Sequence, residues 1–107
     1  MHIEIDHSNP IALQVLQALK SVLDPELAIS IVDLGLIYKI DIHNNKAVII
    51  MTLTTMGCPL FSVMQQDIRQ AALSVPEIQE AEIQLTFSPP WSPDKMSNNA
   101  KAQLGKF

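Results

Sequence analysis

Prolines divide this chain into segments whose apolar residues recur at two different periods. Apolar residues three or four positions apart predict a helix over residues 10–23, which Asn9 can cap and Pro10 can begin. A second helix is predicted over residues 59–74, before Pro76 stops the pattern. Each helix has one apolar stripe to bury, and the stripes are Ile11, Val15, Ala18, Leu19 and Val22 in the first and Leu60, Val63, Met64, Ile68, Ala71 and Ala72 in the second.

Alternation of apolar and polar side chains predicts a first strand over residues 36–43 and a third over residues 80–87, and richness in β-branched residues predicts a second strand between them, over residues 46–54. Asn44 and Asn45 tolerate the backbone angles of a tight hairpin turn, so the first two strands should pair antiparallel. A weaker helix follows the third strand, which gives the order α-β-β-α-β-α. This order predicts an α/β protein of the two-layer α+β sandwich type, with a small mixed sheet and helices on one face. The side chains expected to point inward from the third strand are Ala81, Ile83, Leu85 and Phe87.

Length and composition favour a single folded domain over residues 1–107. Hydrophobic residues make up 48% of the chain and charged ones only 17%, which is enough apolar material for a core. The net charge of -4 provides no basic field, so nucleic acids and membrane surfaces are not expected partners. A single cysteine excludes an internal disulfide, and the first residues do not resemble a secretory signal, so we expect a cytoplasmic protein.

The single cysteine, Cys58, lies between the second predicted strand and the second predicted helix. If Pro59 is the first helical residue, the Cys58 sulfur lies near the free N–H groups at the positive end of the helix dipole, which lowers a thiol pKa. Gly57 allows a sharp turn that keeps the sulfur at the surface. A thiolate there attacks electrophiles or binds soft metals. A lone cysteine is also commonly a small buried apolar residue, so the pattern leaves both interpretations open.

Three threonines precede Cys58 and supply hydroxyl groups near it in sequence. Thr52 and Thr54 share one face of the predicted strand, and Thr55 falls in the turn that follows. Their hydroxyls are able to donate hydrogen bonds to an anion or a sulfide. The alternative is that they are ordinary β-branched strand formers.

Acidic residues form another candidate group. Asp24 and Glu26 flank Pro25, and either they lie beside the thiol or Asp24 caps a short turn with Glu26 at its start. Asp33, two residues before Gly35, is interpreted first as a turn residue and second as an acidic residue of the site.

Trp91 lies in a rigid loop between Pro89 and Pro93. It either anchors this loop on the core or forms an exposed docking point for a partner. The three histidines do not combine with Cys58 in any spacing that gives four zinc ligands. No serine-histidine-aspartate arrangement, phosphate-binding loop or dinucleotide fingerprint is present, so we do not expect an enzyme.

Taken in order, four stretches of the sequence resemble the small iron-sulfur cluster assembly proteins that include SufT, PaaD and the eukaryotic cytosolic iron-sulfur targeting factor. They are Asp24-Pro25-Glu26-Leu27, Ile31-Val32-Asp33-Leu34-Gly35-Leu36-Ile37-Tyr38, Met51-Thr52-Leu53-Thr54-Thr55 through Cys58-Pro59-Leu60, and Leu85-Thr86-Phe87 with Pro89-Pro90-Trp91. The resemblance implies an α/β fold of the iron-sulfur assembly type. It also implies that Asp24, Glu26, Thr54 and Thr55 line a site around Cys58. Met56 stands where the family often has proline, and the C-terminal cysteine cluster of PaaD-type members is missing, which disfavours a PaaD role.

The function implied is that of an iron-sulfur maturation factor that helps to deliver clusters to apoproteins. Clusters usually need four ligands, mostly thiolates, and this chain offers Cys58 alone. Any cluster is therefore expected to be transient and shared with a second copy in a homodimer, another protein of the assembly machinery or a small thiol. Two alternatives stay open: an adaptor that docks through Trp91, with Cys58 incidental, and a thiol enzyme or redox sensor, for which no histidine base or resolving cysteine is visible.

Overall fold

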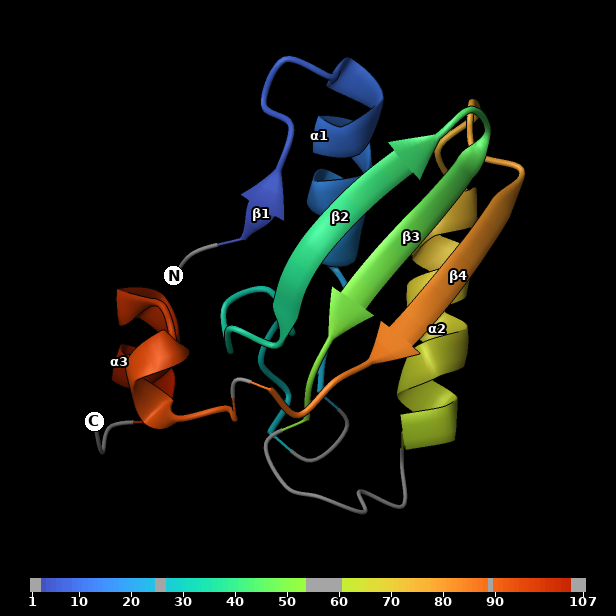
Figure 1. The fold of residues 1–107 in the computed structure, drawn as a ribbon. Coiled ribbons are helices and arrows are strands. Elements are labelled where there is room, and N and C mark those ends of the chain that lie inside the picture. Colours follow the sequence, from blue (N-terminus) through green and yellow to red (C-terminus); the bar gives the residue numbers. More distant parts are fainter. Residues whose placement is uncertain (1–2, 25–26, 54–60, 89, 105–107) are drawn as a thin grey trace.

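The structure is a computed structural model and describes residues 3–24, 27–53, 61–88 and 90–104. Within these residues, a four-stranded mixed sheet forms the centre of the protein (Figure 1). Its strands lie side by side in chain order: β1 (Glu4–Ile5), β2 (Ile37–His43), β3 (Lys46–Met51) and β4 (Glu80–Leu85). β2 and β3 form an antiparallel hairpin, whereas β1 pairs parallel with β2 and β4 pairs parallel with β3.

Two helices, α1 (Pro10–Leu19) and α2 (Phe61–Leu73), lie together behind the sheet (Figure 1). α1 begins as its sequence predicts, because the Asn9 side chain accepts hydrogen bonds from the N–H groups of Ile11 and Ala12 at 2.9 and 3.3 Å. A 3-10 turn, η1 (Pro93–Lys95), leads into α3 (Asn98–Leu104). In Figure 1, α3 lies apart from α2.

The core lies between the sheet and the two helices. Ala47, Ile49 and Met51 alternate along β3 and are completely buried, whereas the residues between them are half-buried. The other face of the sheet carries ion pairs, with the Lys39 ammonium 3.1 Å from the Glu4 carboxylate. One face of the sheet is therefore apolar, and the other carries charged side chains.

The predicted fold class and the order of the longer elements are confirmed, and β1 is an addition. This strand has two residues, so it carries no periodic signal of its own. α1 also ends at Leu19 rather than near residue 23, because the next turn tightens: the Val22 N–H donates to the Leu19 carbonyl three residues back. Val22 is still buried, but outside the helix.

Three residues predicted to face the core are exposed. Val63 is 50% exposed because the buried face of α2 consists of Met64, Ile68 and Ala72, four positions apart, and Val63 lies to the side of that line. Leu85 and Phe87 are 39% and 38% exposed. β4 is an edge strand, so Leu85 has a neighbouring strand on one side only, and Phe87 lies beyond the strand.

Candidate functional site

Asp24 caps a short turn after α1. Its carboxylate accepts a hydrogen bond from the Leu27 N–H at 3.0 Å, and its carbonyl accepts one from the Ala28 N–H at 2.8 Å. Asp24 is only 6% exposed, and Ala28 has a φ of 57°, a left-handed conformation that closes the turn. The turn geometry expected for Asp24 is therefore present, and Glu26 lies outside the described residues.

The turn over residues 33–35 is held by the C-terminal segment. The Asp33 carbonyl accepts a hydrogen bond from the Ser97 N–H at 2.7 Å, and its carboxylate accepts one from the Ser97 hydroxyl at 3.1 Å. The Trp91 Nε1–H donates to the Leu34 carbonyl at 2.7 Å. Gly35 has a φ of +79°, and a Cβ atom built on it would lie 2.3 Å from the Lys95 carbonyl oxygen. Glycine is thus required both for the backbone angle and for the close approach.

We name Trp91, Lys95 and Ser97 the C-terminal clamp. Trp91 is half-buried against the hydrophobic core, and its only N–H donor group on the ring is used inside the protein. The structure thus places Trp91 as an anchor of its loop. Lys95 contributes a second contact, because its ammonium lies 5.2 Å from the centroid of the Tyr38 ring, within the range of a cation–π interaction.

Thr52 continues the ladder of β3 beyond the end of the strand. Its N–H donates to the Leu36 carbonyl at 2.8 Å, and the whole residue is buried. Its hydroxyl oxygen makes no hydrogen bond of standard geometry within the described residues. Burial raises the pKa of the Tyr38 phenol, and the neighbouring Thr52 hydroxyl lowers it in part. Tyr38 itself lies at a bulge, where the register between β2 and β3 shifts.

Several predicted site residues lie outside the described residues, and they are Glu26, Thr54, Thr55, Gly57 and Cys58. Among the described ones, the structure brings Asp33, Thr52 and Trp91 to the end of the sheet where β3 ends and β2 begins. Sequence reasoning missed Tyr38, Lys95 and Ser97. The role of Ser97 leaves no local pattern in the sequence, because this residue lies 64 residues from its partner Asp33.

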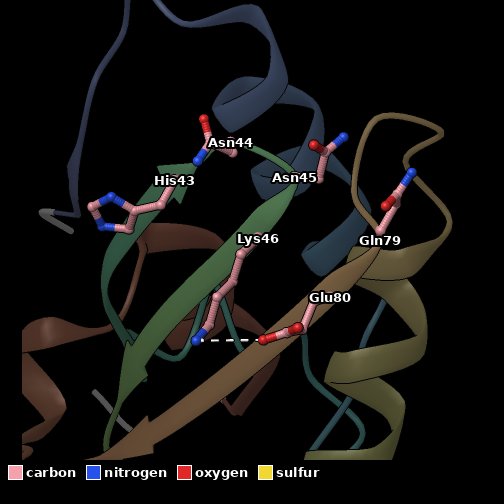
Figure 2. A pocket seen from close by; sticks show the side chains of 6 residues that line it. All are labelled: His43, Asn44, Asn45, Lys46, Gln79 and Glu80. Carbon is pink, nitrogen blue, oxygen red and sulfur yellow. Dashed lines mark ion pairs between the residues drawn. The ribbon is translucent and has the colours of Figure 1, made fainter.

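A polar pocket lies at the opposite end of the sheet, around the hairpin turn (Figure 2). Figure 2 shows the Lys46 ammonium directed toward Glu80, at 3.4 Å, and a second carboxylate, that of Glu82, lies 2.8 Å from it. His43 is exposed, as expected for a residue beside the turn, with its ring nitrogen 3.1 Å from the Asp41 carboxylate. The pocket lining is His43, Asn44, Asn45, Lys46, Gln79 and Glu80.

Neither a metal-binding cluster nor a membrane-spanning helix occurs among the described residues. No group of three or more histidine, cysteine, aspartate or glutamate side chains in this part of the chain is arranged to hold a metal ion. Within the same residues, no helix combines the length and the apolar character needed to cross a membrane.

Comparison with known proteins identifies the class. Residues 13–85 match the iron-sulfur cluster assembly protein family. The chain is 42% identical over 92 residues to the "Fe-S protein maturation auxiliary factor YitW" of Bacillus subtilis, covering 85% of this chain and 90% of that protein. It is 44% identical over 85 residues to the "Fe-S protein maturation auxiliary factor SufT" of Staphylococcus aureus, covering 78% and 97%.

The fold agrees with this assignment. A crystal structure of a domain of unknown function, DUF59, from Bacillus anthracis superposes with a TM-score of 0.84 at 39% identity, covering 91% of this chain and 93% of that one. The chain belongs to the iron-sulfur cluster assembly protein family, which confirms the resemblance found in its sequence.

Proposed function

We propose that this protein is an iron-sulfur maturation factor that holds a cluster briefly through Cys58 and hands it to apoproteins. Its relatives from B. subtilis and S. aureus are named as auxiliary factors of iron-sulfur protein maturation, which supports the role. The observation that carries the proposal is that a chain of this family has one thiol, Cys58. Iron-sulfur clusters are bound chiefly by thiolates, so Cys58 is the residue expected to contact the cargo.

The cluster is cargo, because one chain supplies one thiolate of the four ligands that such clusters usually need. The remaining ligands come from a second copy, a protein of the assembly machinery, a client apoprotein or a small thiol. Incomplete and exchangeable ligation of this kind favours transfer over storage. The protein acts as a carrier and not as a catalyst, in the reducing cytoplasm, where a lone thiol stays available.

Asp24, Asp33 and the threonines have separate parts in this proposal. Asp24 and Asp33 each use a carboxylate oxygen to fix a turn, so they shape the region around the site. Thr52 is buried and fixes the end of β3. Glu26, Thr54, Thr55 and Gly57 remain predicted neighbours of Cys58, following the family resemblance.

The test is anaerobic reconstitution with iron and sulfide, read by absorbance and Mössbauer spectroscopy, for the wild type and Cys58→Ser. We expect the wild type to take up a cluster and to transfer it to an apoprotein, and Cys58→Ser to do neither. A matched control adds Ser74→Cys to Cys58→Ser, which restores the number of thiols at an exposed position at the far end of α2. Equal uptake and transfer by the wild type and Cys58→Ser would refute the role of the thiol.

The adaptor alternative requires Trp91 to contact a partner. The structure gives this residue an internal role, because its indole N–H donates to the Leu34 carbonyl. No observation therefore favours the adaptor over the carrier.

A further inference from the structure

The two longer helices have an outer side that faces away from the sheet, and this side carries little charge. α1 and α2 lie together on one side of the sheet, with their buried residues toward it (Figure 1). Across residues 10–23 and 61–74, the charged side chains are those of Lys20, Asp67 and Arg69. Arg69 reaches the sheet, because its Nε–H donates to the Ala81 carbonyl of β4 at 3.5 Å. The outer side therefore keeps one positive and one negative charge.

Large apolar side chains are exposed on the same outer side. Leu13 of α1 and Val63 of α2 are 39% and 50% exposed, and Leu23, which follows α1, is 51% exposed. Leu23 lines an open groove of about 540 Å³ between the end of α1 and α2. We name this surface the helix face, and its residues are Leu13, Lys20, Leu23, Val63, Asp67 and Gln70. Exposed apolar side chains with few charges are typical of the centre of a protein interface.

The two charges of the helix face differ from those of the sheet in having no partner within the described chain. The lysines of β2 and β3 have carboxylate partners at 3.1 and 2.8 Å. Among the described residues, no ion pair includes Lys20 or Asp67. Both are exposed at the same groove, since Asp67 lines it and Lys20 directly precedes Ser21, which lines it too. They are therefore available to charges of a partner.

We propose that this partner is a second copy of the chain, whose helix face packs on the first about a two-fold axis, with Lys20 of each copy opposite Asp67 of the other. In a two-fold interface one patch meets itself, so the patch has to be complementary to itself. One cation and one anion on the same patch meet this condition. The whole chain has a net charge of -4, which repels a second copy, whereas the charges of the helix face balance. A strongly basic or acidic partner would find no matching field there.

The size of the helix face sets the strength of this dimer. α1 has 10 residues and α2 has 13, so the helices are about 15 and 20 Å long, and side by side they are about 20 Å wide. The face thus covers about 300–400 Å² on each copy, less than the roughly 800 Å² per partner of a standard interface. We therefore expect a weak dimer, with a Kd of roughly 10 μM to 1 mM.

A charge exchange tests the pairing of Lys20 with Asp67. Sedimentation equilibrium of the full chain from about 5 μM to about 1 mM, at low salt and with a reductant, gives the Kd of the dimer. Asp67→Lys places like charges opposite each other at two places, so it should weaken the dimer about tenfold or more. The double variant Lys20→Asp/Asp67→Lys exchanges the two charges and should return the Kd to within about threefold of the wild type. The matched control is Asp94→Lys, the same change of charge at an exposed position in η1.

A second pair of variants tests the apolar part of the contact. Leu23→Ala truncates the exposed leucine at the groove, and we expect it to weaken the dimer about five- to tenfold. Its control is Leu85→Ala, which truncates an exposed leucine on β4, outside the helix face, and should leave the Kd unchanged. Circular dichroism checks that every variant is folded at the temperature of the measurement.

A wild-type protein that stays monomeric at about 1 mM would overturn the proposal, even if its helix face bound a different protein. A dimer that Asp67→Lys and Leu23→Ala weaken no more than their controls would also overturn it, because another surface would then join the copies. The same holds if the double variant does not restore the dimer. Cys58→Ser should dimerise like the wild type, and loss of its dimer would indicate a disulfide in place of the helix face. Cluster transfer is measured separately, so failure of the proposed function is distinguishable from failure of this contact.

Discussion

Replacing Gly35 with alanine should destabilise the protein strongly, because the added Cβ atom would strain the backbone and would also overlap with a neighbouring residue. The φ of +79° places the residue in the left-handed region, where a Cβ costs about 1–2 kcal/mol. The new Cβ would also lie 2.3 Å from the Lys95 carbonyl oxygen and 2.8 Å from the Lys95 carbonyl carbon, so backbone must move. Forcing a group into a packed site typically costs about 1–3 kcal/mol. The sum is about 2–5 kcal/mol, a large fraction of the stability of a small domain.

Urea and thermal denaturation measure this loss. For a domain near 100 residues, each 1 kcal/mol lowers the Tm by about 4–8 °C, so Gly35→Ala should lower it by about 10 °C or more. Ala28→Gly is the control, because Ala28 is a non-glycine residue with a φ of 57°. Glycine would relieve the backbone strain at this position but would also raise the entropy of the unfolded chain, and these two effects offset each other. We therefore expect the free energy of unfolding to change by less than about 1 kcal/mol. A Gly35→Ala protein within about 0.5 kcal/mol of the wild type would refute the assigned close packing of Lys95 on the turn.

Two further predictions concern α1 and the charged face of the sheet. Asn9→Ala removes the cap of α1 and should lower the free energy of unfolding by about 1 kcal/mol in urea titration, whereas Asn9→Asp, which keeps a capping oxygen, should not. The hydrogen bond from Lys46 holds the pKa of Glu82 below its ordinary value of 4.5, so the stabilisation from this carboxylate is present above that pH and is lost as the pH falls through the lowered pKa. Lys46→Met should therefore raise the pKa of Glu82 in an NMR titration, and an unchanged pKa would contradict the pairing.

The longer elements were predictable because each carries a local signal. The alternation of polar and apolar residues in β4 and the four-residue spacing of Met64, Ile68 and Ala72 in α2 are local properties of the sequence, whereas β3 is a continuous apolar run rich in β-branched residues. Which end of an edge strand is covered depends on how the elements pack, and this explains why Leu85 was predicted inward but is exposed. β1 was missed for a related reason: its two residues form a strand only because β2 is beside them.

The candidate site likewise has a part that the sequence predicts and a part that it does not. Asp33 and Gly35 predict a turn from the sequence alone, and the structure shows that turn. The contacts that hold it come from Ser97 and Trp91, which are 64 and 57 residues away from their partners, so no short motif encodes them. Cys58 as the cargo ligand stays a prediction from the sequence and the family.

These long separations have a consequence for the order of folding. Each strand pairs with the strand before or after it in the chain, and the β2–β3 hairpin closes a turn of two residues, so it forms on the microsecond scale. Closing a loop of about 60 residues costs more entropy and has no docking surface until the turn over residues 33–35 exists. We therefore expect docking of Trp91 to be the last step of folding. Since Trp91 is the single tryptophan in the sequence, its fluorescence would report the docking of this segment without a signal from a second tryptophan.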